Sequence, residues 1–261
     1  MIWIIIISLL ILLIFGLYWL VKFKQGEAAL IEAFSDNNVL VFGAKGKGKD
    51  MIFNKTINIR DMPCYANIPY NKLLCTEKEI SELSIAPNTF ENIMNNDIKV
   101  IPKTNKECTD YYISDAGNYL PAQYSAQLVK KYPSLPSYYS LSRHLYNSNI
   151  HANTQDLGRV WNLLREQASI FIKAEKTTKH LFGYALVTTF IVYDRYESAA
   201  SEIRPFKTHF LNSEAKALKI DFEAKHGRVE RFKIVQLKKN IHYDSRAFHR
   251  KIFGYNSPDT I

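Results

Sequence analysis

One segment combines glycine and lysine residues at a spacing suited to binding phosphate. The segment Gly43-Ala44-Lys45-Gly46-Lys47-Gly48-Lys49-Asp50 follows a short apolar run, Val39–Phe42, and precedes Met51 and a stretch that can be helical. Strand, glycine loop and helix in this order are the context that a Walker A motif, GxxxxGK[ST], requires. Backbone amides of such a loop can form an anion-binding nest, and the helix N-terminus adds partial positive charge. We therefore predict that residues 43–51 bind nucleotide phosphates, with Lys49 reaching the β and γ phosphates.

Asp50 is the departure from this motif, because Ser or Thr normally stands there and ligates Mg²⁺. A carboxylate beside a polyphosphate is repelled unless a cation lies between the two. We therefore expect Asp50 to bind Mg²⁺ directly or through a water molecule. The alternative is a surface turn rich in Gly and Lys that binds no ligand.

A second carboxylate should lie at the end of a neighbouring strand. Tyr111–Ser114 is a plausible strand that ends at Asp115, although Ala116 stands where a second acidic residue is usual. Asp115 would hold the Mg²⁺-bound water, or it would replace the catalytic glutamate while Ser114 takes the metal position and Asp50 supplies the metal carboxylate. The alternative role for Asp115 is that of a simple turn residue.

Further candidates come from the segment Asn149–Gln155, which we expect to be a strand that ends in polar residues, and from its surroundings. Gln155 would face the γ phosphate, where an amide can orient the attacking water, because ligands of doubly wound sheets sit beyond the carboxyl ends of the strands. Arg159 and Arg165 lie in a segment with helical spacing and are candidates for an arginine finger given in trans. Arg143 is a candidate of the same kind. A solvated helix face or a structural ion pair is the alternative for each arginine.

The N-terminus predicts a membrane anchor. Residues Ile2–Val21 carry no charge over 20 positions, which is the length needed to cross a hydrocarbon core of about 30 Å. Trp3 and Trp19 lie near its ends, where interfacial aromatic side chains are favoured. A cleaved signal peptide would need a charged start and a shorter apolar run. Lys22 and Lys24 follow at once, so the positive-inside rule places the rest of the chain in the cytoplasm.

Composition narrows the class of protein. The 261 residues carry a net charge of +9 and are 47% hydrophobic, which suits one or two folded domains and excludes a disordered chain. Cys64, Cys75 and Cys108 form no CxxC pair, so a disulfide scaffold and a zinc ribbon are excluded and reduced thiols are expected. Residues 204–251 hold 13 Lys or Arg against 5 Asp or Glu. The basic character therefore belongs mainly to the C-terminal fifth.

This basic region follows a predicted core strand at Ala185–Tyr193. Residues 219–225, the turn at His226-Gly227 and residues 228–237 predict a β-hairpin. Its basic side chains are candidates for contact with DNA or anionic lipid, because clustered Lys and Arg neutralise phosphates. The alternative is an ordinary solvated face. The residues concerned are Lys216, Lys219, Lys225, Arg228 and Arg231.

Together these motifs resemble the zonular occludens toxin family, which includes the assembly ATPases of filamentous single-stranded DNA phages. The resemblance is carried by Gly43–Asp50, Tyr65–Pro69, Ile113–Ala116, Ser142–His144, Asn153–Gln155 and Leu164–Glu166. It implies a P-loop NTPase of the additional-strand type, with ATP and Mg²⁺ as ligands, the acidic role at Asp115 and the sensor role at Gln155. It also implies a role in extruding phage DNA and coat through the host membrane. The chain departs from the family at Asp50, at the single carboxylate and in having its anchor before the NTPase domain.

The expected fold is α/β, a P-loop NTPase with a mainly parallel sheet, one N-terminal transmembrane helix and a β-rich basic C-terminal region. The expected parts are an anchor at 1–21, a tether at 22–38, the NTPase domain at 39–203 and a basic extension at 204–261. Expected partners are further copies in a ring such as a hexamer, single-stranded phage DNA or its nucleoprotein complex, phage coat and assembly proteins, and the host cytoplasmic membrane. Two alternatives are a nucleotide-binding scaffold with little hydrolysis and a membrane-tethered DNA-binding protein.

Overall fold

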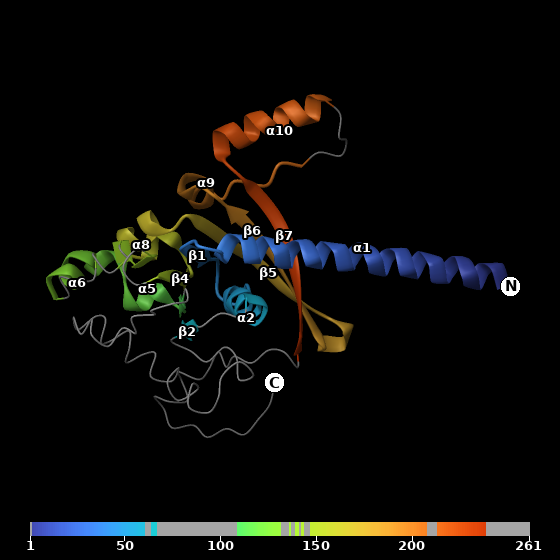
Figure 1. Cartoon of the computed structure of the whole chain (residues 1–261), viewed down its shortest axis with the longest axis horizontal. Helices are drawn as coiled ribbons and strands as arrows, with labels where there is room; N and C mark the ends of the chain where they lie inside the picture. The colour runs from blue at the N-terminus through green and yellow to red at the C-terminus, as the bar shows by residue number, and fades with distance from the viewer. Residues whose placement is uncertain are drawn as a thin grey trace, which may run out of the picture.

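The described part of the chain is built on one sheet. The computed structural model describes residues 2–60, 64–66, 109–131, 136, 139–140, 142–143, 147–207 and 213–238, so Cys75, Cys108 and His144 lie outside the described residues. Seven strands follow the order β2-β3-β4-β1-β5-β6-β7 (Figure 1). Their bounds are β1 Val39–Phe42, β2 Cys64–Ala66, β3 Thr109–Ile113, β4 Ser148–Thr154, β5 Ile170–His180, β6 Ala185–Tyr193 and β7 Val229–Leu237.

The sheet is mainly parallel, which confirms the expected fold class. Strands β2, β3, β4, β1 and β5 pair in parallel, whereas β6 runs antiparallel to both β5 and β7. Two strands, β3 and β4, separate β1 from β2. Phe42 pairs with Thr154, and Ile113 pairs with Ala152. The carboxyl ends of β1, β3 and β4 therefore meet at one edge of the sheet, as a site between them requires.

Helices cover both faces of the sheet. The helices of the described residues are α1 Ile2–Phe34, α2 Lys49–Arg60, α5 Ala116–Tyr119, α6 Ser125–Lys131, α8 Asn162–Gln167, α9 Tyr196–Ala200 and α10 Ser213–His226. One apolar core contains Leu30 and Phe34 of α1 with Ile52 and Phe53 of α2. The other core joins the opposite face to α5, α8 and the segment around α9. Figure 1 shows α10 set apart from the sheet.

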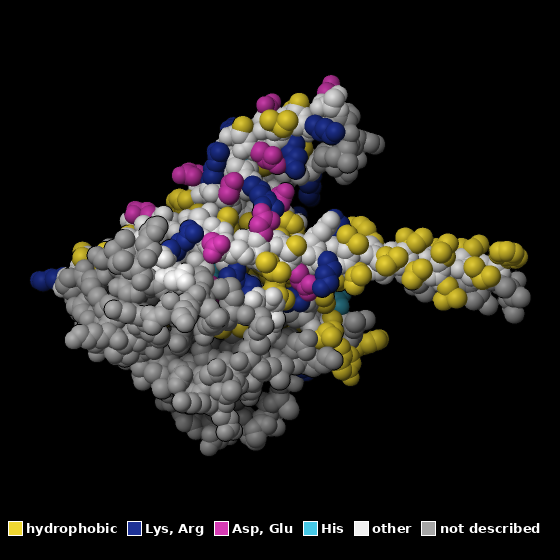
Figure 2. Space-filling view, in the orientation of Figure 1, with side chains coloured by type: hydrophobic (Ala, Val, Ile, Leu, Met, Phe, Trp, Pro, Cys, Tyr) yellow, Lys and Arg dark blue, Asp and Glu magenta, His cyan; other side chains and the backbone are white. Residues whose placement is uncertain are grey.

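Helix α1 has two unlike halves. Most of the large apolar side chains described between Trp3 and Val21 are about half exposed or more (Figure 2), as a helix that meets lipid would have them. Within the described residues, α1 is the helix that is long and apolar enough to cross a bilayer by length and composition.

The expected tether at 22–38 is helical as far as Phe34 and packs against the domain. Ala29, Leu30, Ala33 and Phe34 are buried, and their spacing forms a stripe on one face of a helix. Gly26 lies so close to β7 that a Cβ atom there would be 2.0 Å from the carbonyl oxygen of Lys233. The second half of α1 is therefore part of the fold.

The expected hairpin over 219–237 is wrong. Residues 213–226 form α10, while Val229–Leu237 pairs with β6. The alternation of Ile220, Phe222 and Ala224 spans only three apolar residues, and the Ala, Leu, Lys and Glu around them are strong helix formers. Gly227, at φ 71°, ends the helix in the left-handed conformation, and its N–H donates to the Glu223 carbonyl at 2.8 Å.

Candidate functional site

The glycine loop connects β1 to α2, as the sequence predicts. Gly43, Gly46 and Gly48 have φ values of 139°, 77° and 99°, in the region that favours glycine. A Cβ atom on Gly43 would lie 2.6 Å from the Ala174 carbonyl oxygen, and one on Gly48 would lie 2.1 Å from Thr177 Oγ1. Strand β5 therefore backs the loop so closely that side chains are excluded at these two positions.

Lys49 begins α2 and turns back into the loop. Its side chain is buried, and Nζ donates to the carbonyl oxygens of Gly43 at 2.8 Å and Ala44 at 3.4 Å. Burial lowers the pKa of Lys49, while the charges of Asp50 and Asp115 oppose that shift. A cationic group that is poorly solvated and held by two loop carbonyls is well placed to exchange them for phosphate oxygens.

Asp50 is tied to the ends of two strands. Its Oδ1 accepts hydrogen bonds from Ser114 Oγ at 3.0 Å and from Asn153 Nδ2 at 2.8 Å. Asn153 Oδ1 also accepts from the backbone N–H of Asp115 at 2.8 Å. Asn153 thus bridges the two candidate acidic residues. Sequence reasoning used it only as part of a motif, although a buried polar residue at the end of a parallel strand is a signal of a site.

Asp115 lies just beyond β3 in the left-handed conformation, at φ 52°, and is exposed on one side. Partial burial raises its pKa, and so does the nearby charge of Asp50, while Lys49 and Lys45 lower it. Two carboxylates and two ammonium groups therefore share one electrostatic environment. A carboxylate with a raised pKa is the better proton acceptor near neutral pH.

These residues fit Mg²⁺ only together with a nucleotide. The described residues contain no group of three His, Cys, Asp or Glu that could hold a metal ion alone. Mg²⁺ is usually bound by one or two carboxylates with phosphate oxygens and water completing its shell. Asp50 would supply one such carboxylate, and Asp115 would supply a second one or act on the metal-bound water. A cation beside Asp50 would offset the charge that, together with burial, raises the pKa of Asp115.

A cleft of about 750 Å³ opens beside the loop. Gln155 is exposed in this cleft together with Gly43, Ala44 and Lys47, so the structure brings the expected sensor residue to the loop. The remaining lining residues come from the turn after β4, from β5 and from the α9 region: Phe42, Asp156, Leu157, Gly158, Lys173, Ala174, Glu175, Tyr196, Ala199, Ala200 and Glu202.

None of the three candidate arginines lines this cleft. Arg165 donates to the Tyr196 hydroxyl at 2.8 Å and to Asn162, and its guanidinium lies 5.6 Å from the Tyr196 ring centroid. Arg143 is exposed, and so is Arg159, whose Cβ lies beside Gly117. Within one chain Arg165 is a structural residue, and only a neighbouring copy would present any of these side chains to the cleft.

The five basic candidates divide into two groups. Lys216, Lys219 and Lys225 are exposed on α10, where Lys219 also pairs with Glu223 at 3.3 Å. The two arginines are held by acidic side chains: Arg228 pairs with Glu32 and with Glu230, and Arg231 pairs with Glu175 at 2.7 Å. The exposed positive charge of this set therefore lies on the helix, which also carries Glu214, Asp221 and Glu223, and the arginines fasten β7 to its neighbours.

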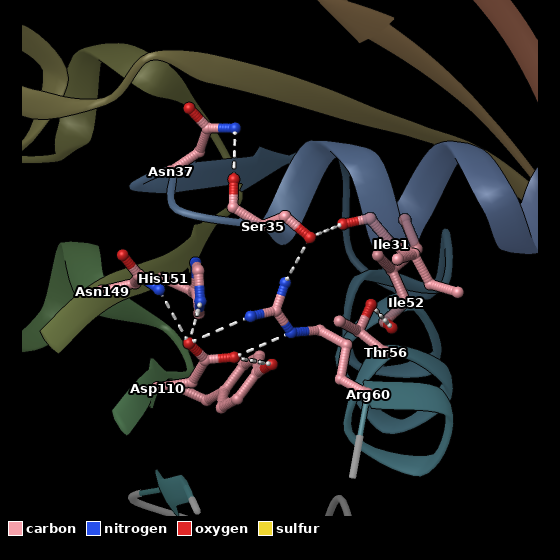
Figure 3. Close-up of polar contacts among 10 residues, drawn as sticks. Ile31, Ser35, Asn37, Ile52, Thr56, Arg60, Asp110, Asn149 and His151 are labelled. Atoms are coloured by element: carbon pink, nitrogen blue, oxygen red, sulfur yellow. Dashed lines mark hydrogen bonds and ion pairs between the residues drawn. The ribbon is translucent and has the colours of Figure 1, made fainter. Parts of the chain in front are cut away.

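A second polar cluster is buried near the start of β3 and β4 (Figure 3). Asp110 accepts from Asn149 Nδ2 at 3.0 Å and the Tyr112 hydroxyl at 3.2 Å, and its oxygens lie 3.0 Å from Arg60 Nε and 3.4 Å from His151 Nε2. Burial alone would raise the pKa of Asp110, but these partners outweigh it and lower that pKa. Burial lowers the pKa of His151.

The cluster fixes α2 at the end opposite to the loop. Arg60 is the last residue of α2, and it also donates to Ser35 Oγ at 3.4 Å just after α1. The helix that carries Lys49 and Asp50 at its start is thus tied to β3 and β4 at its other end. Nothing in the spacing of Arg60, Asp110 and His151 along the sequence indicated that they meet.

The chain is similar to several solved structures at low sequence identity. No family model matches the sequence, and no curated protein matches it either. Among solved structures, the genome packaging NTPase B204 from Sulfolobus turreted icosahedral virus 2, in complex with ATP-gammaS, is similar with 15% identity and a TM-score of 0.41 over 61% of this chain and 92% of its own.

The family that the sequence resembles is also found among these structures. The N-terminal domain of zonular occludens toxin from Neisseria meningitidis is similar with 16% identity and a TM-score of 0.43, over 69% of this chain and 97% of its own. The DNA-packaging ATPase B204 from Sulfolobus turreted icosahedral virus has 15% identity and a TM-score of 0.39, over 61% of this chain and 92% of its own.

Proposed function

We propose that this chain is a membrane-anchored ATPase that powers the assembly and extrusion of a filamentous single-stranded DNA phage. The observation that carries the ATPase is the hydrogen-bonded network of Asp50, Ser114, Asn153 and Asp115 at the carboxyl ends of β3 and β4, with Lys49 turned back into the loop that follows β1. The phage role is supported by the resemblance of the sequence motifs to the zonular occludens toxin family.

Each residue has a task that follows from its place. The loop amides and Lys49 bind the phosphates, and the glycines let the backbone approach them. Asp50 would hold Mg²⁺ beside Ser114, and the metal would neutralise charge on the phosphates. Gln155, exposed in the cleft, would orient water toward the γ phosphate, and Asp115 would take the place of a catalytic glutamate and accept the proton of that water. An arginine from a neighbouring copy in a ring would complete the site.

Substitution at the loop tests nucleotide binding. In the full chain in detergent, Lys49→Ala removes the buried ammonium, and we expect ATP affinity to fall at least a hundredfold. Lys216→Ala removes an exposed lysine on α10 and serves as the matched control. Equal ATP affinity in Lys49→Ala and the control would contradict the proposal.

Substitution at the strand end tests hydrolysis. Asp115→Asn keeps the shape but removes the proton acceptor, so we expect ATP binding to persist while phosphate release falls by about 10²–10⁴-fold. Asp221→Asn, on the exposed side of α10, is the matched control. Normal turnover in Asp115→Asn would exclude its catalytic role.

One observation favours a second function, a nucleotide-gated assembly scaffold with little hydrolysis. Ala116 follows Asp115, so this strand end carries one carboxylate rather than two. Phosphate release by the unsubstituted chain, with and without single-stranded DNA, separates the two functions. Binding of ATP without turnover under both conditions would support the scaffold, whereas turnover that depends on Lys49 and Asp115 supports the motor.

The DNA contact is proposed for α10, whose lysines are exposed. The triple substitution Lys216→Gln, Lys219→Gln and Lys225→Gln should weaken DNA binding and flatten its dependence on salt, because fewer counterions are released. Binding of DNA that is unchanged in affinity and salt dependence would exclude α10 as the DNA contact.

A further inference from the structure

A long hairpin extends beyond the site. Phe42, the last residue of β1, pairs with Lys173, yet β5 continues to His180 before the turn at Leu181–Gly183 and the return along β6. The tip of this hairpin is apolar and exposed. Phe182 is fully exposed, and Tyr184 is 72% exposed. Figure 2 shows hydrophobic side chains gathered at this turn.

Basic side chains lie along the hairpin toward its aromatic tip. Lys176, Lys179 and His180 of β5 are exposed, and residues 176–193 contain no Asp or Glu. The end of β7 lies beside the tip, since the N–H of Lys238 donates to the Tyr184 carbonyl at 2.8 Å. Leu237 and Lys238 are exposed there and add one apolar and one basic side chain. Aromatic side chains at the end of a hairpin that carries exposed lysines, and no acidic residue over 176–193, suit a layer of anionic lipid headgroups.

The tip points to the side from which the anchor leaves. In Figure 1 the hairpin of β5 and β6 slopes toward the lower right and ends on the side of the domain from which the apolar half of α1 leaves. Strand β7 fixes the two relative to each other. Thr189 of β6 pairs with Lys233 of β7, and Lys233 Nζ lies 4.5 Å from the ring centroid of Trp19, near the end of the apolar stretch.

We propose that the β5–β6 tip is a second membrane contact, in which Phe182 and Tyr184 enter the headgroup layer of an anionic bilayer while Lys176, Lys179 and Lys238 meet lipid phosphates. This inference rests on the proposed anchoring of the chain by α1. The apolar and basic character of the tip, its exposure and its direction favour lipid over nucleic acid or protein. Together with α1, the tip would hold the domain at two points and limit its rotation about the helix.

The test uses full-length protein in vesicles. Phe182→Trp places a fluorophore at the tip, and Leu218→Trp places one at an exposed position on α10 as the matched control. Vesicles contain phosphatidylcholine with about one third phosphatidylglycerol, and part of the phosphatidylcholine is brominated near the glycerol backbone to quench nearby tryptophan. The unsubstituted chain emits from Trp3 and Trp19, which report whether α1 is inserted, and from Trp161 inside the domain. Its emission is subtracted from that of each variant to isolate the introduced fluorophore.

We expect the emission maximum of the tryptophan introduced by Phe182→Trp to lie at a shorter wavelength than that of the tryptophan introduced by Leu218→Trp. Brominated lipid should quench the tip fluorophore at least twofold and leave the α10 fluorophore unquenched. Replacing Lys176 and Lys179 by Gln, or leaving out phosphatidylglycerol, should reduce the quenching at the tip.

Two outcomes would overturn the inference. The first is emission from the tip fluorophore that is water-like and unquenched, in a sample where brominated lipid quenches the unsubstituted chain. Such a result would show that α1 is inserted while the tip stays in water. The second is a blue shift at the tip that grows with protein density but is insensitive to brominated lipid, which would assign the tip to a second copy. ATP affinity, measured on the same samples, tests the proposed ATPase separately.

Discussion

Replacing Asp110 by Asn should destabilise the domain strongly. The side chain of Asp110 is 1% exposed and that of Arg60 is 6% exposed, so the guanidinium would lose its charged partner in a largely buried site. The amide also presents donors where Asn149, Tyr112 and His151 now meet a carboxylate. Removing one partner from a buried ion pair costs about 3–5 kcal/mol, which is a large share of the roughly 5–15 kcal/mol that typically stabilises a domain.

Urea unfolding of the full chain in mild detergent measures this cost. The fluorescence of Trp161, which is buried in the domain, reports the transition. Glu223→Gln is the matched control, because its partner Lys219 lies 3.3 Å away with both side chains about half exposed, and an exposed pair contributes only about 0–1 kcal/mol. A second comparison adds Arg60→Met to Asp110→Asn, which should recover part of the loss. A loss below about 1 kcal/mol in Asp110→Asn would refute the view that the cluster holds α2 to the sheet.

Three further changes have expected outcomes. Gly26→Val should separate α1 from β7, because even a Cβ atom would lie 2.0 Å from a carbonyl oxygen. Faster proteolysis between α1 and β1 would reveal this separation. Gly16→Val is the control and should leave proteolysis unchanged, because a Cβ atom there has no neighbour within 4 Å. Gly48→Ala should lower ATP affinity at least tenfold, because its Cβ would lie 2.1 Å from a threonine hydroxyl of β5. Titration calorimetry measures the affinity, and an unchanged value would contradict the close packing of the loop against β5. The folded-state pKa of His151 lies below its ordinary value of 6.5, so below about pH 6.5 the unfolded chain binds more protons and the free energy of unfolding falls. Urea midpoints at about pH 7.5 and 5.5 check this, and His151→Phe should reduce the difference.

Local patterns predicted the part of the fold that local forces determine. The buried run Val39–Phe42, the glycine loop and α2 are contiguous, and so their order alone indicated the phosphate-binding geometry. The strands at 109–113, 148–154 and 185–193 also form close to their expected positions. Gln155 reaches the cleft for the same reason, because it directly follows a parallel strand.

Long-range contacts account for the features that local sequence patterns did not predict. Asn153 joins Asp50 to the backbone of Asp115 across more than a hundred residues of chain, and no spacing rule encodes such a bridge. The second half of β5 is polar because it backs the loop and leaves the body of the domain, so it lacks a strand's apolar pattern. The α10 segment shows the converse, since a brief alternation of apolar residues was outweighed by helix propensity over fourteen residues.

The two halves of α1 set different limits on how far the chain can be shortened. A cut after Val21 removes the apolar stretch that is exposed to the surroundings and leaves the core intact. A cut before Val39 also removes Leu30 and Phe34, which are fully buried, and fully burying such a side chain contributes about 1.5–3 kcal/mol. It would also deprive Lys55 of its pairing with Glu27. Water-soluble versions of this protein should therefore begin near residue 22. Removing residues 1–21 should be enough for solubility, whereas removing residues 22–38 as well should destabilise the fold.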